Sequence, residues 1–263
     1  MPLFPLNERG TIMTRETITS RKNPLLQHVR KLLSSRSYRE QCGEYAADGI
    51  KLLEEAVKWT PDTLRTVLVT EDVDLPNLPE QVRLVEIPKD IMVQISPMEA
   101  PQGALFTCAM PEMGVISVEN RCLILDGIQD PGNLGTILRT ADAMEVPVVL
   151  TPGCADAYNH KTVRASMGAV FRSKPQWASH EAVAEFCKEQ GLPFYVTALS
   201  DRAVDVRQAN LTRAALVIGS EGKGVGEFFL SKADREVIIP MSSRCESLNA
   251  AIAAAIVLWE MKR

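Results

Sequence analysis

The chain has 263 residues, of which 46% are hydrophobic and 24% are charged, a composition typical of a globular protein with one or two domains. No uninterrupted apolar stretch approaches the ~20 residues that a membrane-spanning helix needs, so we expect no association with a membrane. The formal net charge of −4 does not by itself indicate a nucleic-acid partner. Only local clusters of positive charge could suggest one.

The first residues and the cysteines indicate a compartment. Residues 1–10 lack the basic start and apolar core of a secretory signal, and we expect residues 1–14 to be disordered. The six cysteines are scattered and form no Cys-x-x-Cys pair, which disfavours disulfides and a metal site. We therefore expect a cytoplasmic protein with free thiols and no bound metal.

Two clusters of basic residues interrupt the acidic background. The stretch from Arg15 to Arg39 has seven basic residues and one acidic residue, an excess of +6 that could contact phosphates. The alternative is a solvated helix face after Asn23-Pro24. A second cluster lies between His160 and Lys174. The predicted RNA-binding residues are Arg21, Lys22, Arg30, Lys161, Arg164 and Arg172.

Residues 1–113 are predicted to form a small α/β domain. An apolar stripe at helical spacing predicts a helix over Asp48–Trp59. Strands are predicted at Arg65–Val69, Gln81–Ile87 and Ala104–Ala109, separated by turn-forming residues. A linker at Met110–Gly114 then precedes a second domain, residues 114–263.

The second domain alternates between apolar strands and helical patterns, one of which covers Glu181–Gln190. Continuous Val, Ile and Leu strands that alternate with helices favour a parallel sheet covered on both faces. The predicted strands are Cys122–Leu125, Pro147–Leu150, Phe194–Ala198, Ala215–Ile218 and Val237–Ile239.

The first strand of this domain leads into Asp130-Pro131-Gly132-Asn133 and then a helix. Functional sites in open α/β sheets gather at the carboxyl ends of strands, so this position suits a site. Asn133 would equally serve as a helix N-cap. Arg139 lies two turns further on and could be an ordinary solvent-facing arginine.

A second segment, Gly219–Gly224, is a glycine-rich loop that follows a strand. It is not a phosphate-binding P-loop, because Lys223 is followed by glycine and the spacing is wrong. Its alternating glycines also fail the dinucleotide-binding fingerprint. The glycines would let the backbone approach a cofactor closely, although turn formation alone also explains them.

The third segment runs from Ile238-Ile239-Pro240 into Ser247-Leu248-Asn249, which opens an apolar helix near the C-terminus. Ser243 and Glu246 have the spacing of a capping box, which explains part of the turn. The helix is apolar around most of its circumference, so we expect it to be buried or at a subunit interface. Ser247 and Asn249 are polar residues at the N-terminal end of this helix. If they are buried they need hydrogen-bond partners, and a ligand is one candidate.

Together, these three segments resemble the motifs of the SpoU/TrmH family of RNA ribose 2′-O-methyltransferases. The resemblance spans residues 121–263. Upstream, residues 18–24, 45–49 and 95–103 resemble the ribosomal-protein-like substrate-binding domain that often precedes it, a pairing commonest in enzymes of large-subunit ribosomal RNA. This likeness implies an α/β fold with a mostly parallel sheet, helices on both faces and a deep trefoil knot. It also implies a homodimer that forms through the C-terminal domain.

The resemblance assigns roles to individual residues. By position, S-adenosylmethionine would be bound by Gly219, Ile239 and Leu248, with Thr197, Ala198, Leu199, Ile218 and Met241 as neighbours. The residues that match the catalytic positions of the family are Asn133, Arg139, Glu221, Ser247 and Asn249. Because the pKa of an arginine lies above ~12, we favour Arg139 as a clamp on ribose and phosphate rather than as a base. Glu221 would orient Arg139 or organise its loop.

The leading hypothesis is therefore methylation of a ribose 2′-hydroxyl in large-subunit ribosomal RNA. A transfer-RNA ribose methyltransferase is the alternative within the same chemistry. From another class, the chain could be a non-catalytic RNA-binding assembly factor that retains the fold. A small-molecule Rossmann-type enzyme is disfavoured, because the first strand–helix turn lacks the required glycines.

Overall fold

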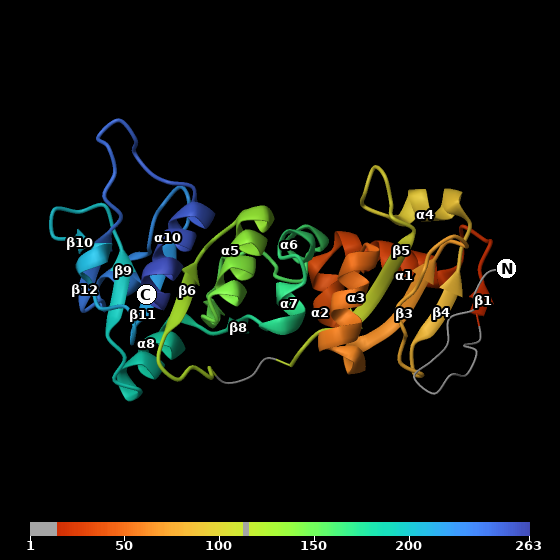
Figure 1. Cartoon of the computed structure of the whole chain (residues 1–263), viewed down its shortest axis with the longest axis horizontal. Helices are drawn as coiled ribbons and strands as arrows, with labels where there is room; N and C mark the ends of the chain where they lie inside the picture. The colour runs from red at the N-terminus through yellow and green to blue at the C-terminus, as the bar shows by residue number, and fades with distance from the viewer. Residues whose placement is uncertain (1–14, 113–115) are drawn as a thin grey trace. The chain divides into compact units, whose positions relative to one another are not determined.

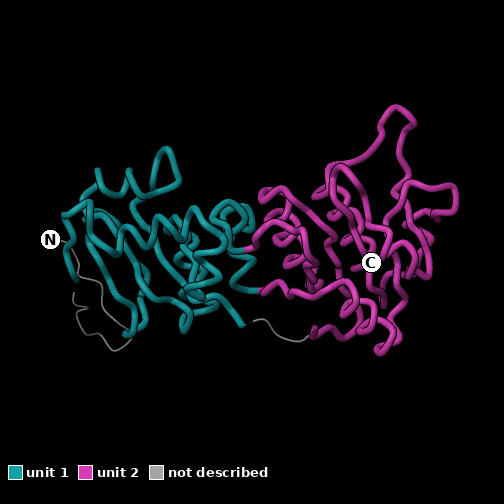
Figure 2. Tube along the Cα trace, turned by 180° about the vertical axis from the view of Figure 1, so that it is seen from behind, with its two compact units in different colours: residues 1–112, 158–172 teal, residues 113–157, 173–263 magenta. Residues whose placement is uncertain are grey.

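The computed structural model describes residues 15–112 and 116–263, so the disorder expected for residues 1–14 lies outside the described residues. The chain divides into two compact units (Figure 2). Unit 1 comprises the residues up to 112 together with residues 158–172, and unit 2 comprises residues 113–157 and 173–263. No helix in the described ranges is long and apolar enough to cross a membrane.

Unit 1 is built on a mixed five-stranded sheet (Figure 1). The strand order is β1-β4-β3-β5-β2; β1, β4 and β3 are parallel, whereas β5 runs antiparallel to both of its neighbours. The strands are β1 (Arg15–Thr17), β2 (Glu44–Asp48), β3 (Leu64–Val69), β4 (Arg83–Glu86) and β5 (Ala104–Ala109).

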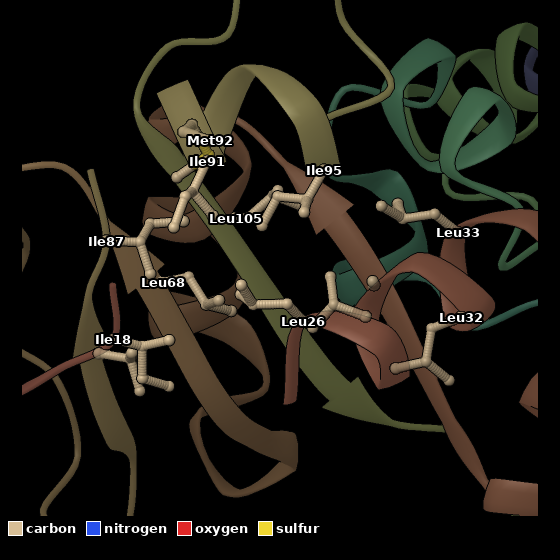
Figure 3. Close-up of a cluster of buried hydrophobic side chains, with 13 residues drawn as sticks. Ile18, Leu26, Leu32, Leu33, Leu68, Ile87, Ile91, Met92, Ile95 and Leu105 are labelled. Carbon is tan, nitrogen blue, oxygen red and sulfur yellow. The ribbon is translucent and has the colours of Figure 1, made fainter. Parts of the chain in front are cut away.

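One face of this sheet is covered by two helices. Buried side chains of α1 and α4, among them Leu26 and Ile91, pack against Leu68 and Leu105 from the sheet (Figure 3). The helices of the N-terminal stretch are α1 (Pro24–Ser34), α2 (Arg36–Cys42), α3 (Ile50–Trp59), the 3-10 turn η1 (Pro61–Thr63) and α4 (Lys89–Ile95).

The opposite face is covered in part by a segment that is distant in sequence. Alternate strand residues point to opposite faces, so Tyr45 and Phe106 lie on the face away from α1. The Tyr45 ring packs on Tyr158 at 4.6 Å between centroids, and Phe106 packs on Phe171 at 6.2 Å. Residues 158–172, which form α6 (His160–Ala165) and α7 (Ala169–Arg172), thus complete the core of unit 1 together with α3.

Unit 2 contains a seven-stranded sheet in which every pairing is parallel. The order is β10-β12-β9-β11-β6-β7-β8, which places the first strand, β6, between β11 and β7. The strands are β6 (Cys122–Asp126), β7 (Val148–Leu150), β8 (Gln176–Trp177), β9 (Phe194–Thr197), β10 (Val204–Asp205), β11 (Ala215–Gly219) and β12 (Arg235–Ile238).

Helices cover both faces of this sheet. On one face, Val183 and Cys187 of α8 and Phe229 of α9 pack with Ile124 and Val217 of the sheet. On the other face, α10 packs against α5 and β11. The predicted parallel α/β sheet with a smaller α/β domain before it is therefore confirmed, while the knot stays a prediction. The helices are α5 (Pro131–Ala143), α8 (His180–Glu189), the 3-10 turn η2 (Val206–Gln208), α9 (Glu227–Leu230) and α10 (Ala250–Lys262).

Candidate active site

A cavity of about 940 Å³ opens at the carboxyl ends of β9, β11 and β12. This edge of a parallel sheet is where ligands of open α/β folds bind. All eight residues predicted to contact the cofactor line this cavity. They are Thr197, Ala198, Leu199, Ile218, Gly219, Ile239, Met241 and Leu248.

The cavity wall formed by the glycine loop, residues Gly219–Gly226, is closely packed. Ser220 and Gly224 exchange two backbone hydrogen bonds, of 3.1 and 2.9 Å, which close the loop into a narrow hairpin. A Cβ atom at Gly219 would lie 1.9 Å from the carbonyl carbon of Gly224, and Gly224 itself has φ +67°. The loop therefore requires glycine at these two positions, where it presents backbone to a ligand.

A chain of hydrogen bonds joins the three sequence segments next to the cavity. The Asn133 Nδ2 donates to Oε1 of Glu221 at 2.7 Å, and the Asn249 Nδ2 donates to Oδ1 of Asn133 at 3.0 Å. Glu221 lines the cavity, as does Ser247. Asn133 and Asn249 are thus connected to the cavity through Glu221.

The helix caps differ from the expected ones. The N-cap of α5 is Asp130, whose Oδ1 accepts from the Asn133 N–H at 2.7 Å, so Asn133 lies inside the helix with its side chain free to reach Glu221. The N-cap of α10 is Asn249, whose Oδ1 accepts from the N–H groups of Ala251 and Ile252. The interpretation of Asn133 as a cap and of Ser243 and Glu246 as a capping box is therefore wrong.

Arg139 lies apart from these contacts. It sits on the exposed side of α5, and its guanidinium makes no hydrogen bond or ion pair with the residues that the structure describes. The structure brings Asn133, Glu221 and Asn249 together, with Ser247 on the cavity wall. It does not bring Arg139 into contact with them.

The sequence reasoning missed one buried carboxylate near the cavity. Asp126 ends β6 with its side chain only 11% exposed, and its Oδ2 accepts from the Gly226 N–H at 2.8 Å. Its Oδ1 accepts from the Thr151 hydroxyl at 3.2 Å and lies 3.1 Å from Nε2 of His180. An acid that ends an otherwise apolar buried strand was the sequence signal for this residue.

The six predicted RNA-binding residues all belong to unit 1. Lys22, Lys161 and Arg164 are exposed. Arg21 pairs with Asp90 at 2.5 Å and Arg172 pairs with Glu55, so a part of their charge is already compensated.

The pKa of His160, at the start of α6, is affected by the positive charges of the second basic cluster. Its pKa is lowered from the ordinary histidine value, first by burial and then by the charges of Lys161, Arg164 and Arg39. In the described ranges, no group of three or more His, Cys, Asp or Glu residues could hold a metal ion.

Comparison with known sequences matches the two parts of the chain to two families. Residues 120–259 match the SpoU rRNA Methylase family, and residues 23–105 match the MRM3-like substrate binding domain. The first match includes every element around the cavity.

Individual proteins resemble the chain over different lengths. It is 33% identical to the 23S rRNA (guanosine(2553)-2′-O)-methyltransferase RlmP of Bacillus subtilis, over 93% of this chain and 98% of that protein. The tRNA (guanosine(18)-2′-O)-methyltransferase of Thermus thermophilus is 36% identical, but over only 54% of this chain and 73% of that protein. The AdoMet-bound rRNA methyltransferase of Sinorhizobium meliloti superposes with a TM-score of 0.84 at 26% identity, over 94% and 97% of the two chains.

Proposed function

This chain belongs to the SpoU rRNA methylase family of S-adenosylmethionine-dependent RNA 2′-O-methyltransferases, and we propose that its substrate is large-subunit ribosomal RNA. The observation that carries the proposal is the cavity of unit 2, whose wall combines the backbone of the glycine loop with Glu221 and Ser247. Such a wall suits a donor that is held by backbone groups and an acceptor hydroxyl that is held by side chains.

Ribosomal RNA is favoured over transfer RNA by the extent of the similarity. The 23S rRNA enzyme matches 93% of this chain, which requires unit 1, whereas the tRNA enzyme matches 54%. Unit 1 carries all six residues predicted to bind RNA and corresponds to a substrate-binding domain. We propose that its exposed cations bind phosphates of a folded ribosomal RNA segment.

The residues around the cavity have separable tasks in the transfer. S-adenosylmethionine, when bound, supplies a methyl group activated by its sulfonium. The glycine loop and the ends of β9 and β12 hold this donor, largely by backbone groups. Asn133, itself held by Asn249, fixes the carboxylate of Glu221. Arg139, which has no competing carboxylate partner in the described ranges, orients the ribose and its phosphate. Most of the acceleration comes from holding the two reactants in line.

We further propose that two copies associate through α10. This helix exposes Ile252 at 53% and Trp259 at 62%, two large apolar side chains seven residues apart and therefore on one face. Exposed large apolar side chains that share a face of a helix are typical of an interface between proteins.

The proposal is tested by transfer of labelled methyl groups to total RNA from a strain that lacks the protein, followed by mapping of the modified ribose. Label on one ribose of large-subunit ribosomal RNA is expected. Label on transfer RNA would replace the proposed substrate by the alternative. Binding of S-adenosylmethionine and RNA without transfer would indicate the non-catalytic assembly factor.

A further inference from the structure

We propose that Asp126 is a positioning residue for methyl transfer, which acts by fixing the far end of the glycine loop through the Gly226 N–H. This inference rests on the proposed function and adds a residue outside the cavity lining to it. Asp126 lies behind the loop, at the carboxyl end of β6, and contacts neither Glu221 nor the cavity in the described structure.

The carboxylate of Asp126 joins three elements that are far apart in the sequence. Its Oδ2 accepts from Gly226, the N-cap residue of α9, at 2.8 Å. Its Oδ1 accepts from Thr151, which follows β7, and contacts His180 at the start of α8. A carboxylate this deeply buried needs such partners, and it places the end of the loop relative to β6, the end of β7 and the start of α8.

The loop is held at two points, and Glu221 lies between them. At its start, the backbone of Gly219 packs against Gly224 with no space for a side chain. At its end, Gly226 meets Asp126 so closely that a Cβ atom added there would lie 3.1 Å from Oδ2. Removal of the second anchor leaves Glu221 held by the Ser220–Gly224 hairpin bonds and the Asn133 hydrogen bond, with the far end of the loop released. A displacement of about 1 Å in such a group can lower a rate by about 100-fold.

The test compares three variants of the full-length enzyme. Asp126→Ala removes every bond of the carboxylate. Asp126→Asn retains an oxygen that can accept from the Gly226 N–H. Thr151→Val removes the neighbouring bond of Oδ1 and the hydroxyl's bond to the Leu125 carbonyl, but leaves the Gly226 bond in place. We expect kcat to fall about 100-fold in Asp126→Ala and to stay within about threefold of wild type in the other two. Hydrogen exchange at the amides of residues 219–226 should accelerate in Asp126→Ala alone.

A second route starts from a variant that keeps the Asp126 carboxylate. In Gly226→Ala the new Cβ presses on Oδ2, whereas φ −68° at this residue permits alanine. We expect Gly226→Ala to lower kcat in the wild-type background and to have no further effect in Asp126→Ala. Equal losses in Thr151→Val and Asp126→Ala, or additive losses in the double variant, would overturn the inference. If the wild-type enzyme methylates no RNA, the proposed function fails, while the exchange rates still decide whether Asp126 anchors the loop.

Discussion

Substitution of Gly219 distinguishes recognition of the donor by backbone groups from a role of this glycine in turn formation alone. In Gly219→Ala the added Cβ would meet rigid backbone of Gly224 at 1.9 Å, so the cavity wall must move. We expect the affinity for S-adenosylmethionine, measured by calorimetry, to fall by about tenfold or more, equivalent to about 1.4 kcal/mol. Gly222→Ala is the matched control, because nothing lies within 4 Å of its Cβ position. Equal binding by both variants would show that the loop does not contact the donor.

Substitution of Arg139 tests whether this exposed cation acts on the RNA ribose rather than on S-adenosylmethionine. Because its guanidinium has no protein partner in the described ranges, Arg139→Ala disturbs no internal contact, and we expect an unchanged melting temperature. Methyl transfer should be abolished, whereas calorimetric binding of S-adenosylmethionine should survive. Turnover comparable to that of the wild type would reject the clamp role.

The structure brings predicted site residues together where a motif determines a backbone path, whereas the sequence misassigned a helix cap where two nearby residues compete. Seven of the eight cofactor positions lie at or just beyond the ends of three adjacent parallel strands, and Leu248 precedes α10, so all eight meet on one cavity. The cap of α5 was misassigned because Asp130 and Asn133 both suit an N-cap, and Pro131, in the first turn of the helix, selects Asp130. Asp126 was missed because its partners come from Thr151, His180 and Gly226, which no local pattern connects.

At the scale of single elements, α6 makes stability depend on pH through His160. Burial and three nearby cations lower its folded-state pKa, while in the unfolded chain the pKa is about 6.5. As the pH falls through 6.5, the unfolded chain takes up a proton that the folded chain resists, so stability is complete above this pH and declines below it.

We therefore expect the free energy of unfolding in urea to decrease between pH 7.5 and pH 5.5 more steeply in the wild type than in His160→Gln. The difference between the two proteins isolates His160 from the titration of other groups. Parallel curves for the two proteins would contradict a lowered pKa of His160.

The exposed face of α10 gives a test of the proposed dimer. Trp259 is 62% exposed and makes few contacts to lose within the chain, so Trp259→Glu should leave the fold intact. We expect this variant to be monomeric in analytical ultracentrifugation at a concentration where the wild type is a dimer. Lys232→Glu, at an exposed position of unit 2 outside α10, is the control. A dimeric Trp259→Glu would place the interface elsewhere.

Among the elements, the strands of unit 2 were the easiest to predict. Their two faces are both covered, so they read as short continuous runs of Val, Ile and Leu, and each predicted strand is present with ends that differ by two residues or fewer. Strand β2 was missed. Its central Tyr45-Ala46-Ala47 is also buried on both faces, but two alanines give no strand preference, and part of its cover comes from residues 158–172.

On the scale of the whole molecule, unit 1 is not a continuous stretch of sequence. A fragment of residues 15–112 alone would expose Tyr45 and Phe106, which the full chain covers with Tyr158 and Phe171. We expect this fragment to bind the dye ANS and to melt at a lower temperature than the same fragment joined to residues 158–172 by a flexible linker. The burial of the two added rings should contribute about 3 kcal/mol or more to the fusion.

A fusion in which Tyr158 and Phe171 are both replaced by serine is the control for this comparison. It should behave like the short fragment, because the linked segment then lacks its apolar anchors. If the control is as stable as the intact fusion, the segment contributes by some means other than ring packing.

Because residues 158–172 pack in unit 1, the ways in which this protein could have been assembled by recombination are limited. A crossover near residue 113 that imported a new N-terminal module would leave the recipient's own Tyr158 and Phe171 against a foreign sheet. A stable hybrid must therefore exchange both stretches of unit 1, the residues up to 112 and residues 158–172, or acquire compensating changes where Tyr158 and Phe171 pack on the sheet. Substrate preference should accordingly evolve more readily by point substitution at the exposed cations of unit 1 than by exchange of the whole module.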